Sequence, residues 1–194
     1  MTSENSVLEA VDQAGRRLRI EFAWQGDRFG HSVSVGQPAA CLLESIEGTS
    51  GENWPASPPF QSLRMETLTD GRLVALLVGM AGQGYWSASV EAVPGELAFL
   101  FDIACRTSGD HSHLGSSYRA PGSASAGAIQ IVPLSIDGEF SLIETDVNGS
   151  ITIRPCDHVH AQSPSSPAGS KTKTPTIRWK YRLSSPAATK RLSP

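Results

Sequence analysis

The sequence predicts an all-β domain, an antiparallel β-sandwich of about ten strands with little helix. Segments in which apolar and polar residues alternate recur along the chain, with turn residues between them. Glycine (18) and proline (13) are frequent among the 194 residues, which indicates many turns and short elements. Helical segments do not alternate with strands, so a parallel α/β sheet is not expected. A closed meander β-barrel is the alternative architecture.

The predicted elements of the first half follow a polar lead-in over residues 1–15, which has one helical turn near residues 7–11. Alternation begins in residues 17–24, where Leu18, Ile20, Phe22 and Trp24 share one side. Next come strands at 29–35 and 41–46, a loop at 47–59, and strands at 63–68 and 72–78 around an Asp-Gly turn. The run 72–78 is nearly all apolar, which is typical of a strand covered on both faces. This run favours the sandwich over the barrel.

In the second half the predicted strands are joined by equally clear turns. They span residues 84–92, 96–106, 128–134, 139–145 and 150–154. A Gly/Ser-rich stretch fills residues 107–127. Asp137-Gly138 and Asn148-Gly149 join the last three strands, and both dipeptides suit the positive φ of type I′ hairpins.

Composition divides the chain into an all-β body over residues 1–160 and a C-terminal part. Residues 161–175 are rich in Ser and Pro, which predicts a flexible linker. Residues 176–184 alternate again, and we expect this basic amphipathic strand to dock on the body. A disordered tail is expected over residues 185–194.

The expected compartment is the cytoplasm. The N-terminus is acidic and lacks the apolar core of a secretory signal. The longest apolar runs, 73–78 and 97–101, are far shorter than the roughly 20 residues that cross a bilayer. Three widely spaced cysteines do not form a disulfide framework.

Charge is segregated along the chain. Residues 161–194 contain seven basic groups and no acid, while the rest holds nine arginines against all 19 acids. Such asymmetry is one mark of a polyanion binder acting through the basic C-terminal strand and tail. In residues 176–184, however, alternation places Trp179 and Tyr181 on the face opposite Arg178 and Lys180. Stacking on bases needs both kinds on one face, so we expect core aromatics and solvated cations instead.

A repeated tetrapeptide is the clearest candidate for chemistry. Asp110-His111-Ser112-His113 and Asp157-His158-Val159-His160 are both Asp-His-x-His. Two histidines at i and i+2 project to the same side of an extended chain. Each motif follows a predicted strand end, at Arg106 and Arg154, so the four histidines would form a tetrahedral site if those ends meet. Zn²⁺ is the metal that imidazoles suit best here, which makes a zinc-binding protein or metal-dependent hydrolase an alternative function.

Two other polar residues have structural interpretations. Asp102 lies within the strand 96–106 and needs a partner, for which Arg106 and Arg119 are the candidates. His31 alternates with Phe29 and Val33, as a satisfied histidine at the core edge does.

The favoured function is a non-catalytic binding or assembly module that presents loops at one end of a rigid scaffold. The chain has no G-x-S-x-G motif, and no spacing assigns catalytic or cofactor-binding residues. We expect a protein or a small ligand as its partner, rather than nucleic acid or a membrane. The sequence leaves the oligomeric state open.

Overall fold

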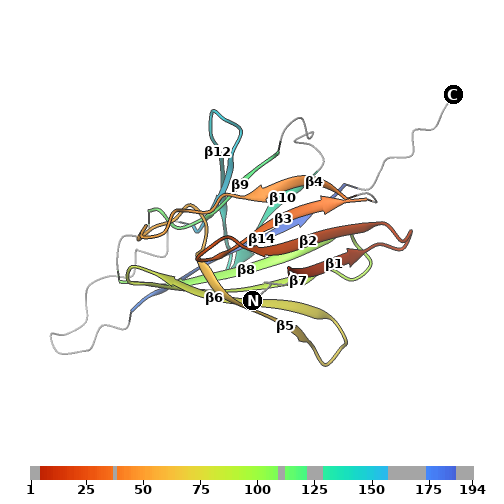
Figure 1. The fold of residues 1–194 in the computed structure, drawn as a ribbon, viewed down its shortest axis with the longest axis horizontal. Coiled ribbons are helices and arrows are strands. Elements are labelled where there is room, and N and C mark those ends of the chain that lie inside the picture. The colour runs from red at the N-terminus through yellow and green to blue at the C-terminus, as the bar shows by residue number, and fades with distance from the viewer. Residues whose placement is uncertain (1–4, 37–38, 109–111, 122–128, 157–173, 187–194) are drawn as a thin grey trace.

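Two seven-stranded antiparallel sheets pack face to face as an open β-sandwich (Figure 1). The computed structural model describes residues 5–36, 39–108, 112–121, 129–156 and 174–186. These residues form fourteen strands and no helix, and therefore no helix long enough to cross a membrane. The predicted fold class is confirmed, and the closed barrel is not formed.

The first sheet has the order β1-β2-β3-β4-β9-β13-β12. Its strands are β1 (Ser6–Val11), β2 (Arg17–Trp24), β3 (Phe29–Val35), β4 (Ala40–Ser45), β9 (Ser116–Arg119), β12 (Leu142–Thr145) and β13 (Ile151–Arg154). The helical turn predicted near residues 7–11 is wrong. These residues belong to β1, which pairs with β2 and buries Leu8 and Ala10.

The second sheet has the order β11-β10-β14-β8-β7-β6-β5. Its strands are β5 (Phe60–Thr67), β6 (Leu73–Ala81), β7 (Gly84–Ala92), β8 (Ala98–Arg106), β10 (Gln130–Ile136), β11 (Glu139–Phe140) and β14 (Thr176–Ser184). The last strand in sequence, β14, lies inside this sheet between β10 and β8. Most residues of the linker predicted over 161–175, and the tail beyond residue 186, lie outside the described residues.

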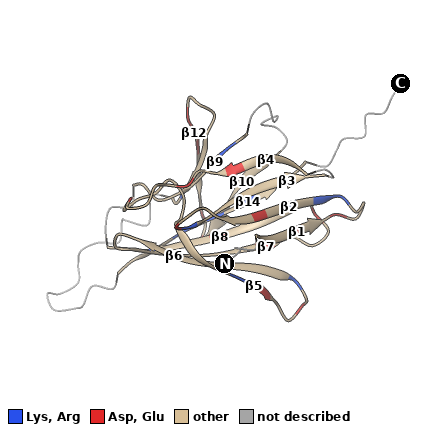
Figure 2. Ribbon diagram, in the orientation of Figure 1, with Lys and Arg blue, Asp and Glu red and all other residues tan. Residues whose placement is uncertain are grey.

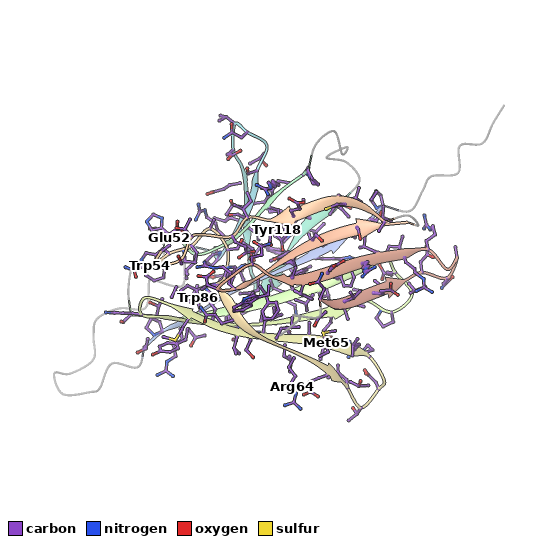
Figure 3. All side chains as sticks on the ribbon, viewed as in Figure 1. Glu52, Trp54, Arg64, Met65, Trp86 and Tyr118 are labelled. Atoms are coloured by element: carbon purple, nitrogen blue, oxygen red, sulfur yellow. The ribbon has the colours of Figure 1, made fainter. Side chains whose placement is uncertain are left out.

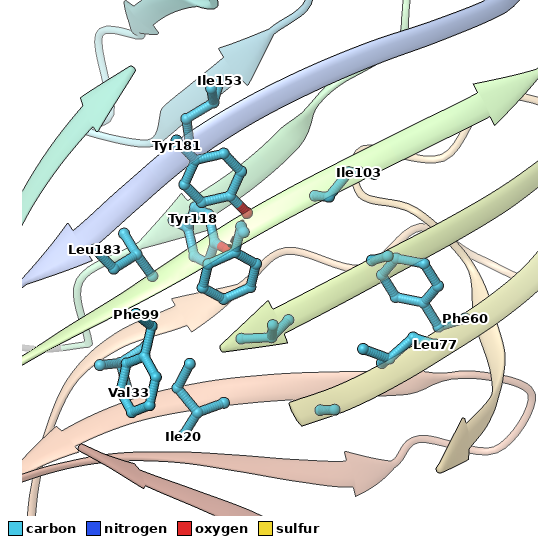
Figure 4. Packing of buried hydrophobic residues seen from close by; sticks show 14 of the residues in the cluster. Ile20, Val33, Phe60, Leu77, Phe99, Ile103, Tyr118, Ile153, Tyr181 and Leu183 are labelled. Carbon is cyan, nitrogen blue, oxygen red and sulfur yellow. Dashed lines mark hydrogen bonds between the residues drawn. The ribbon is translucent and has the colours of Figure 1, made fainter. Parts of the chain in front are cut away.

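The core lies between the sheets and is formed by the alternate residues of both inner faces (Figure 4). Trp179 and Tyr181 of β14 are fully buried, while Arg178 and Lys180 point to the outer face. The separation of aromatics from cations on β14 therefore follows the alternation in the sequence.

Three cysteines, Cys41, Cys105 and Cys156, are free thiols.

The interpretation of residues 72–78 as covered on both faces is wrong. On β6, Ala75 and Leu77 are buried, but Leu76 and Val78 are 41% and 53% exposed on the outer face. β6 has neighbours on both sides in the sheet, and on its outer face Val74 is buried whereas Leu76, Val78 and Met80 are exposed. The apolar run therefore reflects an exposed apolar stripe, although the sandwich itself was predicted correctly.

The strand predicted over residues 139–145 is divided between the two sheets. Residues Glu139–Phe140 form β11 of the second sheet, and Leu142–Thr145 form β12 of the first. Ser141 makes the corner, since its hydroxyl accepts from the Lys180 backbone N–H (3.0 Å) and donates to the Lys180 carbonyl (3.1 Å). One side chain thereby replaces a strand partner for β14 at the point where the chain changes sheet.

The two predicted type I′ turns differ. Asp137 and Gly138 both have positive φ, 52° and 91°, as type I′ requires. At the second turn only Gly149 has positive φ (79°), and Asn148 does not. There the Asp146 N–H donates to the Ser150 carbonyl and the Gly149 N–H to the Asp146 carbonyl, so the turn lies where it was predicted but is not of type I′.

Candidate functional site

The first sheet opens between β3 and β4. These strands pair as far as Ser32 and Glu44, after which β4 turns to β9 and the Ile46 N–H donates to the Ser117 carbonyl (2.8 Å). Across the opening, the His31 backbone N–H donates to the Ser45 hydroxyl (2.8 Å). A side chain thus bridges the strands where a backbone carbonyl would otherwise lie, and this leaves a cleft.

We call this opening the β3–β4 cleft; its cavity volume is about 450 Å³. Its lining is mainly polar and includes Glu21, Gly30, Ser32, Glu44, Glu47 and Arg119. Figure 2 shows acidic residues on β2 and β4, the strands that border the cleft. Arg119 of β9 donates to the Glu44 carboxylate (3.2 Å), and Glu21 accepts from Asn5 (2.6 Å). These charges are therefore held in place by neighbours.

Glu47 has the least satisfied side chain in the cleft. Its Oε1 accepts from the Ser45 hydroxyl at 2.6 Å, while its Oε2 is buried without a hydrogen-bond partner among the described residues. Burial raises the pKa of Glu47 from 4.5 to about 7, against the opposing effects of the Ser45 hydrogen bond and the Arg28 guanidinium. The carboxyl group is therefore poised to change charge near neutral pH.

Arg28 lies beside Glu47 and anchors the loop that follows β4. Its Nη2 donates to Asp27 (2.7 Å) and to the Thr49 carbonyl (3.0 Å). Its Nη1 is buried and has no partner in the part of the chain that the structure describes. The loop continues through Glu52 and Trp54, which Figure 3 places at one end of the sandwich. Arg28 and Glu47 thus each leave one buried polar atom unsatisfied near the cleft.

Behind the cleft, a chain of polar side chains joins the two sheets. His31 Nε2 is 2.9 Å from the Tyr118 hydroxyl, which is 2.6 Å from the Tyr181 hydroxyl. Figure 4 shows the two tyrosines side by side in the core. Burial lowers the pKa of His31 from 6.5 to about 4 and raises the pKa of both tyrosines. All three groups are therefore neutral at pH 7, and the histidine expected at the core edge does lie there.

Only one of the four predicted zinc ligands can be placed. His113 is exposed, three residues before β9, whereas His111, His158 and His160 lie outside the described residues. The segments around the two motifs do lie together, because Arg154 Nη1 donates to the Ser112 carbonyl (3.0 Å) and β13 pairs with β9. Across the described ranges, no cluster of three or more His, Cys, Asp or Glu side chains is arranged to hold a metal.

The basic side chains of β14 form ion pairs with acidic residues in and before β8. Arg178 donates to both carboxylate oxygens of Asp102 (2.9 and 2.8 Å), and Lys180 lies 3.7 Å from the same group. Arg182 pairs with Glu96. Arg106 and Arg119 were the wrong candidates for Asp102, since the partner comes from the adjacent strand β14, remote in sequence. The cations of β14 are thus largely neutralised.

No known protein family, curated protein or solved structure matches this chain. Sequence reasoning missed Glu47, Arg28 and the cleft, because the pairing of β4 with β9 is what opens the sheet. The only sequence signal was an acid directly after a predicted strand, at the start of the loop 47–59.

Proposed function

We propose that the protein is a non-catalytic binding module whose ligand site is the β3–β4 cleft. The observation that carries this proposal is that Glu47 lines a formed cavity while its buried Oε2 has no partner among the described residues. Leaving a buried acceptor unsatisfied is costly, and a bound donor would recover that cost. The volume of about 450 Å³ lies within the range of small-molecule sites.

The lining favours a small molecule that donates hydrogen bonds. Three carboxylates, Glu21, Glu44 and Glu47, face the cavity against one guanidinium, that of Arg119. Arg119 already holds Glu44, so Glu47 is the acceptor left for a ligand. An ammonium or hydroxyl group fits this position, and a carboxylate ligand would be repelled.

The test is a titration of ¹⁵N-labelled protein with ethanolamine, which carries both groups, and with acetate as the opposite charge. We expect ethanolamine to shift the amide signals of Gly30, Ser32 and Ile46 saturably, and acetate to leave them unchanged. Ser32→Phe fills the cleft and should abolish these shifts. Ser34→Phe is the matched control, because Ser34 lies on the same face of β3 outside the cleft. Equal binding by both variants would contradict the proposed site.

A zinc site at the two Asp-His-x-His motifs is a second candidate function. It is supported by the contact of Arg154 with Ser112, which places Ser112, the residue directly before His113, next to the strand that precedes His158 and His160. Neutral imidazoles are good zinc ligands, and four of them would complete a tetrahedral site.

Metal content of the untagged protein measures this directly. One equivalent of zinc, lost in both His111→Ala and His158→Ala, would join the two motifs in a single site. His31→Gln is the control, since His31 Nε2 lies beside Tyr118 in the core. Protein free of metal, with no thermal shift on adding zinc, would remove this candidate.

A further inference from the structure

β12 is an edge strand with one unpaired side. It pairs with β13, and no other described strand pairs with it. Figure 1 shows the β12 hairpin projecting from the body of the sandwich, and all β12 residues are exposed. An accessible strand edge is a template for a further strand.

The alternation of bonded and non-bonded pairs along the hairpin identifies which backbone N–H and C=O groups lie on the open edge. Asp146 donates its N–H to the Ser150 carbonyl, so this pair is hydrogen-bonded. Bonded pairs alternate along an antiparallel ladder, which makes Glu144 with Thr152 the next bonded pair. The backbone groups of Ile143 and Thr145 therefore point away from β13, toward the open edge.

β12 presents apolar side chains along its open edge. On β12, Leu142 and Ile143 lie on opposite faces and are 42% and 39% exposed, and Val147 at the hairpin tip is fully exposed. Its one charge, Glu144, is paired with Arg154 at 2.7 Å. Apolar side chains on both faces suit a strand that continues into a neighbouring sheet.

We propose that two copies of the chain associate through β12, pairing antiparallel about a two-fold axis at Ile143. Ile143 would then exchange both backbone hydrogen bonds with Ile143 of the second copy, because its groups point to the open edge. Ile143 lies opposite Ile153, which is fully buried in the core. The pairing therefore forms a row of four isoleucines across the interface.

The charges are compatible with this register. Leu142 comes opposite Glu144 of the second copy, so no like charges face each other directly. Each Glu144 keeps its own Arg154. The contact is short, and we expect reversible association rather than a permanent dimer.

Sedimentation across a concentration series tests the proposal. The mass should rise from 20.6 kDa toward twice that value. Ile143→Lys places like charges opposite each other and should weaken association by about tenfold or more. Leu76→Lys is the matched control, because Leu76 is equally exposed (41%) but lies on the outer face of β6. It should leave association unchanged.

A second variant separates edge pairing from the loss of an apolar side chain. Thr145→Pro removes an edge N–H, and edge strands tolerate proline where the N–H faces outward. It should weaken association while the circular dichroism spectrum stays that of the wild type. If the wild type is monomeric at every concentration, the proposal is overturned, and the open edge would be a site for a different protein. Dissociation by Leu76→Lys but not by Ile143→Lys, or a mass beyond a dimer, overturns it equally.

Discussion

The Glu47→Gln variant should be more stable than the wild type at pH 8. Burial raises the pKa of Glu47 from 4.5 to about 7, so the folded state binds this proton more tightly than the unfolded state. The unfolding free energy therefore falls as the pH rises between these two values. This difference between the pKa values of Glu47 in the two states lowers the free energy of unfolding by about 3 kcal/mol at pH 8. Glutamine keeps an acceptor for Ser45 and does not ionise.

His31 acts in the opposite direction over an overlapping range. Its pKa is lowered from 6.5 to about 4, so the unfolded state binds this proton more tightly. Stability from His31 is complete above pH 6.5 and is lost as the pH falls toward 4, again by about 3 kcal/mol. In the wild type the two effects nearly cancel between pH 4.5 and 6.5. Glu47→Gln should expose the His31 slope.

Urea unfolding from pH 4 to 8, followed by tryptophan fluorescence, measures both effects. The stability gain of Glu47→Gln should be near zero at pH 4 and largest at pH 8. Glu139→Gln is the control, because Glu139 is an exposed carboxylate on β11. A gain that does not change with pH, or a loss of stability at pH 8, would refute the reasoning from burial.

Three further predictions concern the scaffold, each measured as a change in the free energy of unfolding. Tyr118→Phe should cost about 1–3 kcal/mol, because it removes the hydroxyl shared by His31 and Tyr181; additivity with Tyr181→Phe would contradict a shared network. Asp102→Asn should cost less than about 1 kcal/mol and even less at high salt, since its pair with Arg178 is at the surface. Gly79→Ala should cost about 1–3 kcal/mol, because a methyl group there would overlap the Pro59 carbonyl. The pairing of β5 with β6 shifts register at Phe60, opposite Gly79, and a neutral Gly79→Ala would show that this irregularity adapts easily.

Alternation in the sequence predicted the strands that bury one complete face. Residues 84–92 and 176–184 match β7 and β14, because their inward residues are mostly apolar and their outward residues polar. Where the local pattern competes with tertiary pairing, prediction from alternation failed. The apolar residues of β1 also fit a helical period, and only pairing with β2 makes them a strand. Ser141 divides one alternating segment through a hydrogen bond to the distant Lys180.

The candidate site was less accessible to sequence reasoning than the fold. The β3–β4 cleft depends on β4 leaving β3 for β9, whose residues lie more than 70 positions away in sequence. The raised pKa of Glu47 comes from burial, and burial of a loop residue has no local signature. The histidine motifs were visible in the sequence, but whether they form one site depends on contacts across β9 and β13.

The position of β14 has a consequence for how the chain folds during synthesis. β14 is made after every other described strand, yet it pairs with β8 over nine residues and separates β8 from β10. Until the ribosome has delivered residue 184, β8 exposes an unpaired edge, and the core lacks Trp179 and Tyr181. Such long-range closure slows folding and prolongs exposure to aggregation. A nascent chain of this protein should therefore depend on chaperones for longer than a sandwich whose sheets close in sequence order.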